Sequence, residues 1–162
     1  MFKTLMNVIS MMALTLVSAC AYALVEREIF EVSVTIPTAE FYVLPTELDW
    51  IGREQRLNWD LTAQELSPLR KHFDVKNSNG GITARLSEEP YLSNGRDVDN
   101  IALDVQFNRI KLTVDDATVI SETDGKTGKR VELVIAAVKP DDGYKAGEYY
   151  GSVHMIFEAI AP

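Results

Sequence analysis

Few residues in this chain have the type and spacing needed for acid–base chemistry. Two aspartate pairs, Asp115-Asp116 and Asp141-Asp142, could serve as general acid and base, and His154 could accept a proton. Both pairs stand beside turn residues at the ends of predicted strands, where aspartate commonly bonds to the local backbone. His154 has no partner nearby in the sequence. We therefore predict that the chain is not an enzyme.

Metal and cofactor chemistry has equally little support. The segment Asp97-Val98-Asp99-Asn100 has some of the spacing of a calcium loop, but it lacks the following glycine and the distal glutamate. Cys20 is the only cysteine, and His72 and His154 are the only histidines, which leaves almost nothing for a zinc or redox site. The glycines form no phosphate-binding motif. The sequence predicts no metal and no cofactor.

The two tryptophans offer a third kind of chemistry, a flat platform for a sugar ring. Trp59 alternates with Leu57 and Leu61, a pattern that favours a place in the core. Trp50 follows no such pattern, and its role stays open.

The first residues have the features of an export signal. Lys3 precedes an apolar run from Val8 to Val17, and Ala21-Tyr22-Ala23 fits a small-x-small cleavage site. The run is about half of the ~20 residues that span a bilayer. We predict that residues 1–23 are a signal peptide cut between Ala23 and Leu24. The rival interpretation is a lipoprotein box, Val17-Ser18-Ala19-Cys20, with Cys20 lipidated.

The charge balance argues against nucleic acid as a partner. The chain has 16 basic and 24 acidic residues, a net charge of −8, and loss of Lys3 with the signal makes it −9. Loss of Cys20 would also leave no cysteine, so stability must come from the core and from partners.

Short alternating runs of apolar and polar residues recur along the rest of the chain, separated by proline, glycine and asparagine turns. The runs are 28–36, 40–43, 56–61, 70–76, 82–86, 100–107, 110–114, 130–138 and 149–160. The segment 62–72 could be helical, but Pro68 interrupts it. About eight or nine short strands at this spacing predict an all-β fold, a Greek-key sandwich of immunoglobulin type.

The first and last runs suit each other. The last has an apolar face formed by Tyr149, Gly151, Val153, Met155 and Phe157, and the chain stops soon after it, which predicts an unpaired strand edge. The first has an apolar face formed by Phe30, Val32, Val34 and Ile36, and Pro37 ends it. A free strand and an open edge favour head-to-tail polymerisation by strand addition. The pattern leaves equally open that the first strand folds back into its own sheet.

Several segments resemble one family. They are Val25-Glu26-Arg27-Glu28 with the strand after it, Ile82–Leu92, Ile101–Leu112, Glu132–Ala137 and Ala146-Gly147-Glu148-Tyr149-Tyr150-Gly151-Ser152-Val153. They are similar to the major subunits of alpha-type (class 5) fimbriae, the colonization-factor fimbriae of enterotoxigenic enteric bacteria and the cable pili. The Ala-Gly-x-Tyr-x-Gly piece is the most specific. The region Glu47–Ser67 matches nothing in that family.

The resemblance implies an exported pilin of the alternate chaperone–usher route, with an incomplete immunoglobulin-like sandwich. Residues 24–37 would be a donor strand and residues 38–162 the domain that receives one from its neighbour. Phe30, Val32, Val34 and Ile36 would be the donor face; Tyr149, Gly151, Val153, Met155 and Phe157 would line the acceptor groove. Gly151 would leave room for an entering side chain. The implied partners are like pilin subunits, a periplasmic chaperone, an outer-membrane usher and a tip adhesin. The product would be an adhesive fimbrium on the cell surface.

A second hypothesis remains beside the pilin. It is an exported, self-complete β-sandwich, either a lipoprotein or a binding module, anchored through Cys20.

Overall fold

Period-two alternation of buried and exposed residues builds the sheets of this protein. The computed structural model describes residues 40–160. The predicted signal peptide and the predicted donor strand therefore lie outside the described residues. Residues 40–160 all belong to one compact unit.

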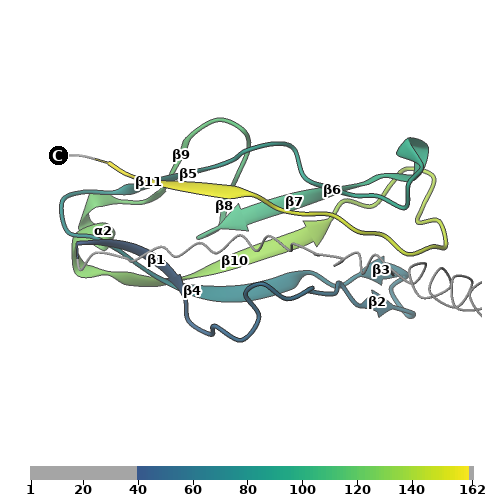
Figure 1. Ribbon diagram of the computed structural model, residues 1–162, viewed down its shortest axis with the longest axis horizontal. Helices are drawn as coiled ribbons and strands as arrows, with labels where there is room; N and C mark the ends of the chain where they lie inside the picture. Colours follow the sequence, from purple (N-terminus) through teal and green to yellow (C-terminus); the bar gives the residue numbers. More distant parts are fainter. Residues whose placement is uncertain (1–39, 161–162) are drawn as a thin grey trace, which may run out of the picture. The chain divides into compact units, whose positions relative to one another are not determined.

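The larger sheet is antiparallel. Its strand order is β1-β4-β10-β7-β6, and a short strand, β8, also pairs with β7 (Figure 1). The strands are β1 (Phe41–Pro45), β4 (Leu69–Asn77), β6 (Tyr91–Leu92), β7 (Ile101–Phe107), β8 (Ile110–Lys111) and β10 (Lys129–Ala137). The sequence left open a helix over residues 62–72. Strand β4 begins directly after Pro68, so residues 69–72 are extended and not helical.

The second sheet has the order β11-β5-β9, with β5 (Ile82–Leu86) between β9 (Ala117–Ile120) and β11 (Met155–Ala159). A separate two-stranded pair joins β2 (Trp59–Asp60) to β3 (Glu65–Leu66). The predicted all-β fold is confirmed.

The core lies between the two sheets. Phe107 is fully buried at its centre, with ring centroids 5.5 Å from Phe73 of its own sheet and 4.8 Å from Phe157 of the other. Buried apolar residues of β4, β5, β7, β9 and β10, with Leu112 just after β8, complete the cluster: Val75, Ile82, Ala84, Leu86, Val105, Leu112, Val119, Ile120, Val131 and Leu133. Buried residues alternate with more exposed ones in β4, β5, β7 and the first part of β10, within runs that the sequence predicted as strands.

The turns hold two departures from the predicted pattern. The segment 121–129 forms a short helix, α2 (Glu122–Thr127), where the sequence predicted only a turn. The Ser121 hydroxyl oxygen accepts from the Asp124 N–H at 3.2 Å and caps the helix. A 3-10 turn, η1, covers Asp97–Asp99. None of the helices within residues 40–160 has the length and apolarity needed to cross a bilayer.

Candidate functional site

Strand β11 is the end strand of the smaller sheet, with only β5 beside it among the described strands. The Ser87 N–H donates to the His154 carbonyl at 3.0 Å, and the Ile160 N–H donates to Gly81 at 3.0 Å. In an antiparallel ladder successive residues point their backbone groups to opposite sides. The backbone groups of Met155 and Phe157 therefore point away from β5. Such an edge can accept another strand.

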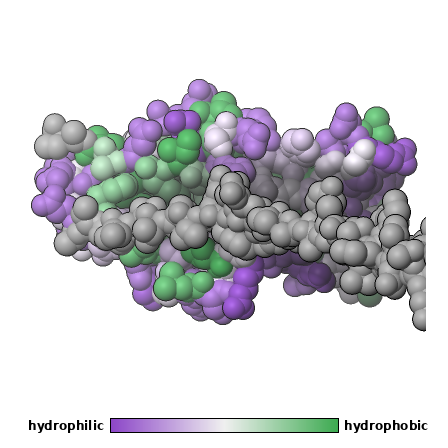
Figure 2. Space-filling model, viewed as in Figure 1, coloured by the Kyte–Doolittle hydropathy of each residue, from purple (hydrophilic) through white to green (hydrophobic). Residues whose placement is uncertain are grey.

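The inward face of β11 is apolar and only partly buried. Met155 lies opposite Leu86 and Phe157 opposite Ala84 in the ladder. These β5 partners are 2% and 1% exposed, whereas Val153, Met155 and Phe157 are half-buried against the same core. Figure 2 shows apolar residues gathered where β11 runs. The structure thus brings together three of the five predicted acceptor residues at one open side of the core.

The facing sheet ends in a similar strand. Strand β1 is the end of the larger sheet, and its Phe41 and Val43 are also half-buried against the core. Pro45 closes it, which suits an edge because proline has no N–H to donate. Sequence reasoning did not include Phe41 and Val43 in the site, although their alternation in residues 40–43 was visible.

The other two predicted acceptor residues lie elsewhere. The sequence predicted one strand over 149–160, but β11 starts only at Met155. Tyr150 instead forms an isolated bridge with Ser93, with N–H···O distances of 2.8 and 2.9 Å. The chain therefore leaves the edge of the larger sheet and crosses to the smaller one. Tyr149 and Gly151 flank this bridge and do not extend the face formed by Met155 and Phe157.

Gly151 has a local reason to be glycine. A Cβ there would collide with the Tyr91 carbonyl oxygen, and would lie 3.1 Å from a methyl carbon of Leu92. The glycine allows two segments of the same domain to approach closely. This reason differs from the one that the sequence suggested, which was room for an entering side chain.

A cavity of about 700 Å³ lies beside this crossing. Its apolar wall includes Leu66, Leu92 and Ile101, and four aromatic residues also line it: Trp59, Tyr144, Tyr149 and Tyr150. The Trp59 ring stands edge-on to Tyr144 at 5.3 Å and is 45% exposed. The prediction that Trp59 belongs to the core is wrong, because β2 and β3 form a pair of their own outside the two main sheets. Burial, with the nearby Glu65 carboxylate, raises the pKa of Tyr144.

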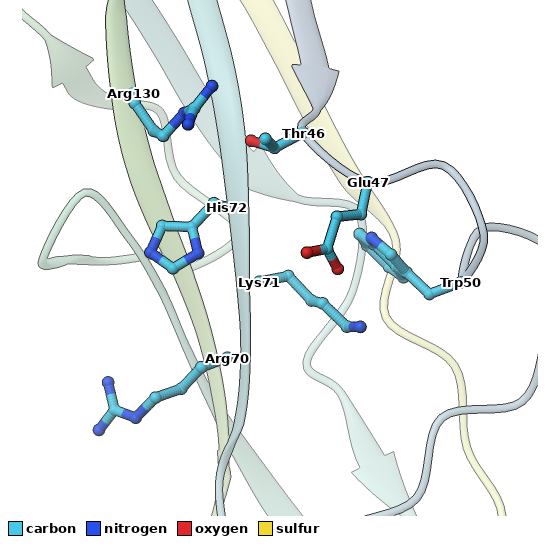
Figure 3. Close-up of a pocket in the computed structure, with 7 residues that line it drawn as sticks. All are labelled: Thr46, Glu47, Trp50, Arg70, Lys71, His72 and Arg130. Carbon is cyan, nitrogen blue, oxygen red and sulfur yellow. The ribbon is translucent and has the colours of Figure 1, made fainter.

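Trp50 lines a second, smaller cavity of about 370 Å³ at the end of β1 (Figure 3). Its ring packs edge-on against Phe73 at 5.9 Å, and the Lys71 ammonium lies 5.2 Å from its centroid. Arg70 and Arg130 line the same cavity. Both are held by carboxylates of the neighbouring strand: Arg70 by Glu132 at 3.0 Å and Arg130 by Asp74 at 2.8 Å.

The residues considered first for chemistry are scattered. Asp116 pairs with Arg85 at 3.3 Å, Asp99 pairs with Arg96 at 3.4 Å, and His154 is exposed. Asp141 and Asp142 lie in the turn closed by the Gly143 N–H and the Pro140 carbonyl. Residues 40–160 contain no cluster of three or more side chains that could hold a metal ion.

Comparison with known proteins identifies the family of this chain. A family model described as CS1 type fimbrial major subunit matches residues 26–158. The chain belongs to the CS1 type fimbrial major subunit family. This is a family of structural fimbrial subunits and not of enzymes.

A solved structure has the same fold as this fimbrial subunit. It is that of the CooA pilin subunit from enterotoxigenic Escherichia coli, with a TM-score of 0.57 and 21% sequence identity. The similarity covers 72% of this chain and 86% of the CooA chain. No curated protein matches the sequence. The resemblance to alpha-type fimbrial subunits stated from sequence is confirmed.

Proposed function

We propose that this fimbrial subunit polymerises head-to-tail by donor-strand exchange. The edge formed by β11 carries the proposal, because Met155 and Phe157, with Val153 just before the strand, are only half-buried against the core, and β5 is the only described strand beside β11. An added strand with an alternating apolar face would cover them and satisfy the outward backbone groups of β11.

The donor would be the strand predicted over residues 24–37 of the neighbouring subunit. Its four inward residues would be Phe30, Val32, Val34 and Ile36. At roughly 1.5–3 kcal/mol for each buried side chain, they would contribute about 6–12 kcal/mol before the cost of ordering the strand. Contacts of this kind are heterologous and do not close, so they produce a fibre.

The proposal includes a route to the cell surface. An open apolar edge on an isolated subunit is an aggregation hazard. A periplasmic chaperone would cover it after removal of the signal peptide, and an outer-membrane usher would exchange the chaperone for the next subunit. A tip adhesin would end the fibre.

Strand complementation by a peptide tests the proposal. The mature chain without residues 24–37 is expected to be unstable, and a synthetic peptide of residues 26–37 should raise its melting temperature. Peptide at 100-fold over its dissociation constant adds about 2.7 kcal/mol, or roughly 10 °C for a domain of this size. The control is the same peptide with Val32→Asp and Val34→Asp. A stable truncated domain that ignores both peptides would contradict the proposal.

The alternative, a lipoprotein anchored through Cys20, concerns a residue outside the described part of the chain. Mass spectrometry of the mature N-terminus separates the two. A start at Leu24 or Val25 supports the pilin, and a diacylated Cys20 supports the lipoprotein.

A further inference from the structure

The two ends of the sandwich differ, and the difference sets how subunits would stack. One end, here called the asparagine pole, consists of the residue 77–81 turn, the start of β1 and the end of β11. The other, the tyrosine pole, consists of the cavity lined by Trp59, Tyr144, Tyr149 and Tyr150. Strand β4 runs from Leu69, near β3 and the tyrosine pole, to Asn77 (Figure 1). Nine residues at about 3.3 Å each separate the poles by roughly 30 Å.

Hydrogen bonds hold the segments of the asparagine pole together. Asn77 is 1% exposed, and its Nδ2 donates to the Gly81 carbonyl at 2.7 Å and to the Ile160 carbonyl at 3.1 Å. The Ser78 N–H donates to the Glu40 carbonyl at 2.7 Å. The described chain therefore begins at this pole, with Glu40.

The direction of the β11 edge is also set. Ile160, directly after β11, is at the asparagine pole, whereas the Tyr150 bridge that precedes β11 lies at the tyrosine pole. A donor subunit could stand at either end of this edge. At the asparagine pole it would stand at the point where the receiver's own extension leaves. A donor standing at the tyrosine pole leaves that extension, at the opposite pole, free to donate onward, as an open fibre requires.

The connecting segment is short. The predicted donor face ends at Ile36, four residues before Glu40, and four extended residues span at most about 14 Å. When Ile36 of the donor lies beside the start of β11, the donor's asparagine pole must therefore lie close to the receiver's tyrosine pole.

The tyrosine pole has the chemistry of a protein contact. Tyr150 is 62% exposed and Trp59 is 45% exposed, beside an apolar wall. Tyrosine and tryptophan are enriched in the cores of protein interfaces, since each combines a large apolar area with one polar group. Asn79 and Glu40, at the opposite pole, are exposed and polar, so their side chains and the turn backbone can bond to tyrosine hydroxyls.

We propose that the tyrosine pole is a socket for a second copy of this chain and receives the residue 77–81 turn of the neighbouring subunit. The inference rests on the proposed donor-strand exchange and adds a second contact between the same two subunits. That contact would fix the angle between successive domains, which a four-residue connection alone leaves free.

Disulfide trapping in assembled fibres tests the socket. The only native cysteine, Cys20, lies in the predicted signal peptide, so engineered pairs have no competing thiol in the mature chain. Full-length chains would carry one cysteine at each pole, in the four combinations of Tyr150→Cys or Lys145→Cys with Asn79→Cys or Glu40→Cys. All four positions are exposed. After oxidation, heating in detergent without reductant should leave a ladder of covalent oligomers for at least one pair, and reductant should collapse it to monomer.

The controls separate this inference from donor-strand exchange itself. The matched control pairs Tyr150→Cys with Asp115→Cys, which is exposed after β8 and away from either pole; it should give monomers, as should each single variant. Fibres that form but yield no ladder from any pair would overturn the socket and leave strand exchange standing. A ladder as strong from the control pair would overturn it also. If the unmodified chain forms no fibre, both proposals fail.

Discussion

The centre of the sandwich and its β11 edge are built from the same kinds of residue but differ in completion. At the centre, Phe107 and Leu133 are 0% and 1% exposed, with strands on both sides. At the edge, Met155 and Phe157 face the same core and remain half-buried. The centre is satisfied by contacts within one domain. The edge has apolar side chains and outward backbone groups that a further strand would cover, and this contrast is what points to assembly.

The largest expected effect is on assembly. Val32→Asp in the predicted donor face should abolish fibre formation, because a carboxylate placed against the β11 edge would be buried without a partner. The secreted subunit should still fold when peptide 26–37 of normal sequence is supplied. Electron microscopy of surface fibres and sedimentation of released protein measure the outcome.

Thr35→Asp is the matched control, since Thr35 lies on the opposite face of the predicted strand. Normal fibres from the Val32→Asp chain would refute the donor face.

The next largest effect is a loss of unfolding free energy when a residue at the centre of the core is truncated. Phe107→Ala removes a fully buried ring that contacts both Phe73 and Phe157, and should cost about 3–5 kcal/mol of unfolding free energy. Urea unfolding of the peptide-complemented subunit measures it. Ile110→Ala, at a site 40% exposed, should change stability by less than about 1 kcal/mol. Equal losses at the two sites would mean that the centre is not the better packed region.

A smaller loss of stability is expected at Asn77, whose side chain links the end of β4 to the residue after β11 by a hydrogen bond. Asn77→Ala should cost about 1–3 kcal/mol, since it removes the Nδ2 donor from the Ile160 carbonyl and one of the two donors from the Gly81 carbonyl, which keeps the Ile160 N–H. Hydrogen exchange should show faster opening at the end of β11 than in β10. Asn79→Ala, at an exposed position in the same turn, serves as the comparison. Uniform loss of protection across both strands would refute the claim that Asn77 stabilises the end of β11 locally.

The smallest expected effect is a change in the pH dependence of stability, through the Asp104 carboxylate. Hydrogen bonds from Lys111, at 2.8 Å, and from Gln106, at 2.7 Å, hold the pKa of Asp104 below its usual value. A carboxyl with a lower pKa in the folded state stabilises it above about pH 4 and loses that contribution as pH falls through the folded-state pKa. Asp104→Asn should therefore destabilise the subunit near neutral pH by about 1 kcal/mol or less, and the difference from the unmodified chain should shrink in acid.

Thermal melts of the peptide-complemented proteins between neutral pH and pH 3 check this difference. A constant gap across the range would mean that the Asp104 charge has no role in stability.

Several features follow from local sequence alone. The strands over 82–86, 101–107 and 129–137 agree closely with the predicted runs, because alternation is visible wherever one face is buried. Only Asn108 and Arg109 separate the predicted runs 100–107 and 110–114, which requires a tight turn, and both residues adopt positive φ, 52° and 66°. Neither requires knowledge of distant residues.

Features that depend on distant partners were decided only by the tertiary structure. The alternation over 149–160 could not show that Tyr150 would bridge to Ser93 and Met155 would pair with Leu86, in two different sheets. Nor could the spacing around Trp59 show that β2 and β3 would stand outside the main sheets. Periodicity reports which residues share a face of a strand, whereas the neighbour of that face is chosen by packing across the whole domain. The residues of the β11 edge could thus be recognised from sequence, but their division between an open edge and a separate aromatic pole could not.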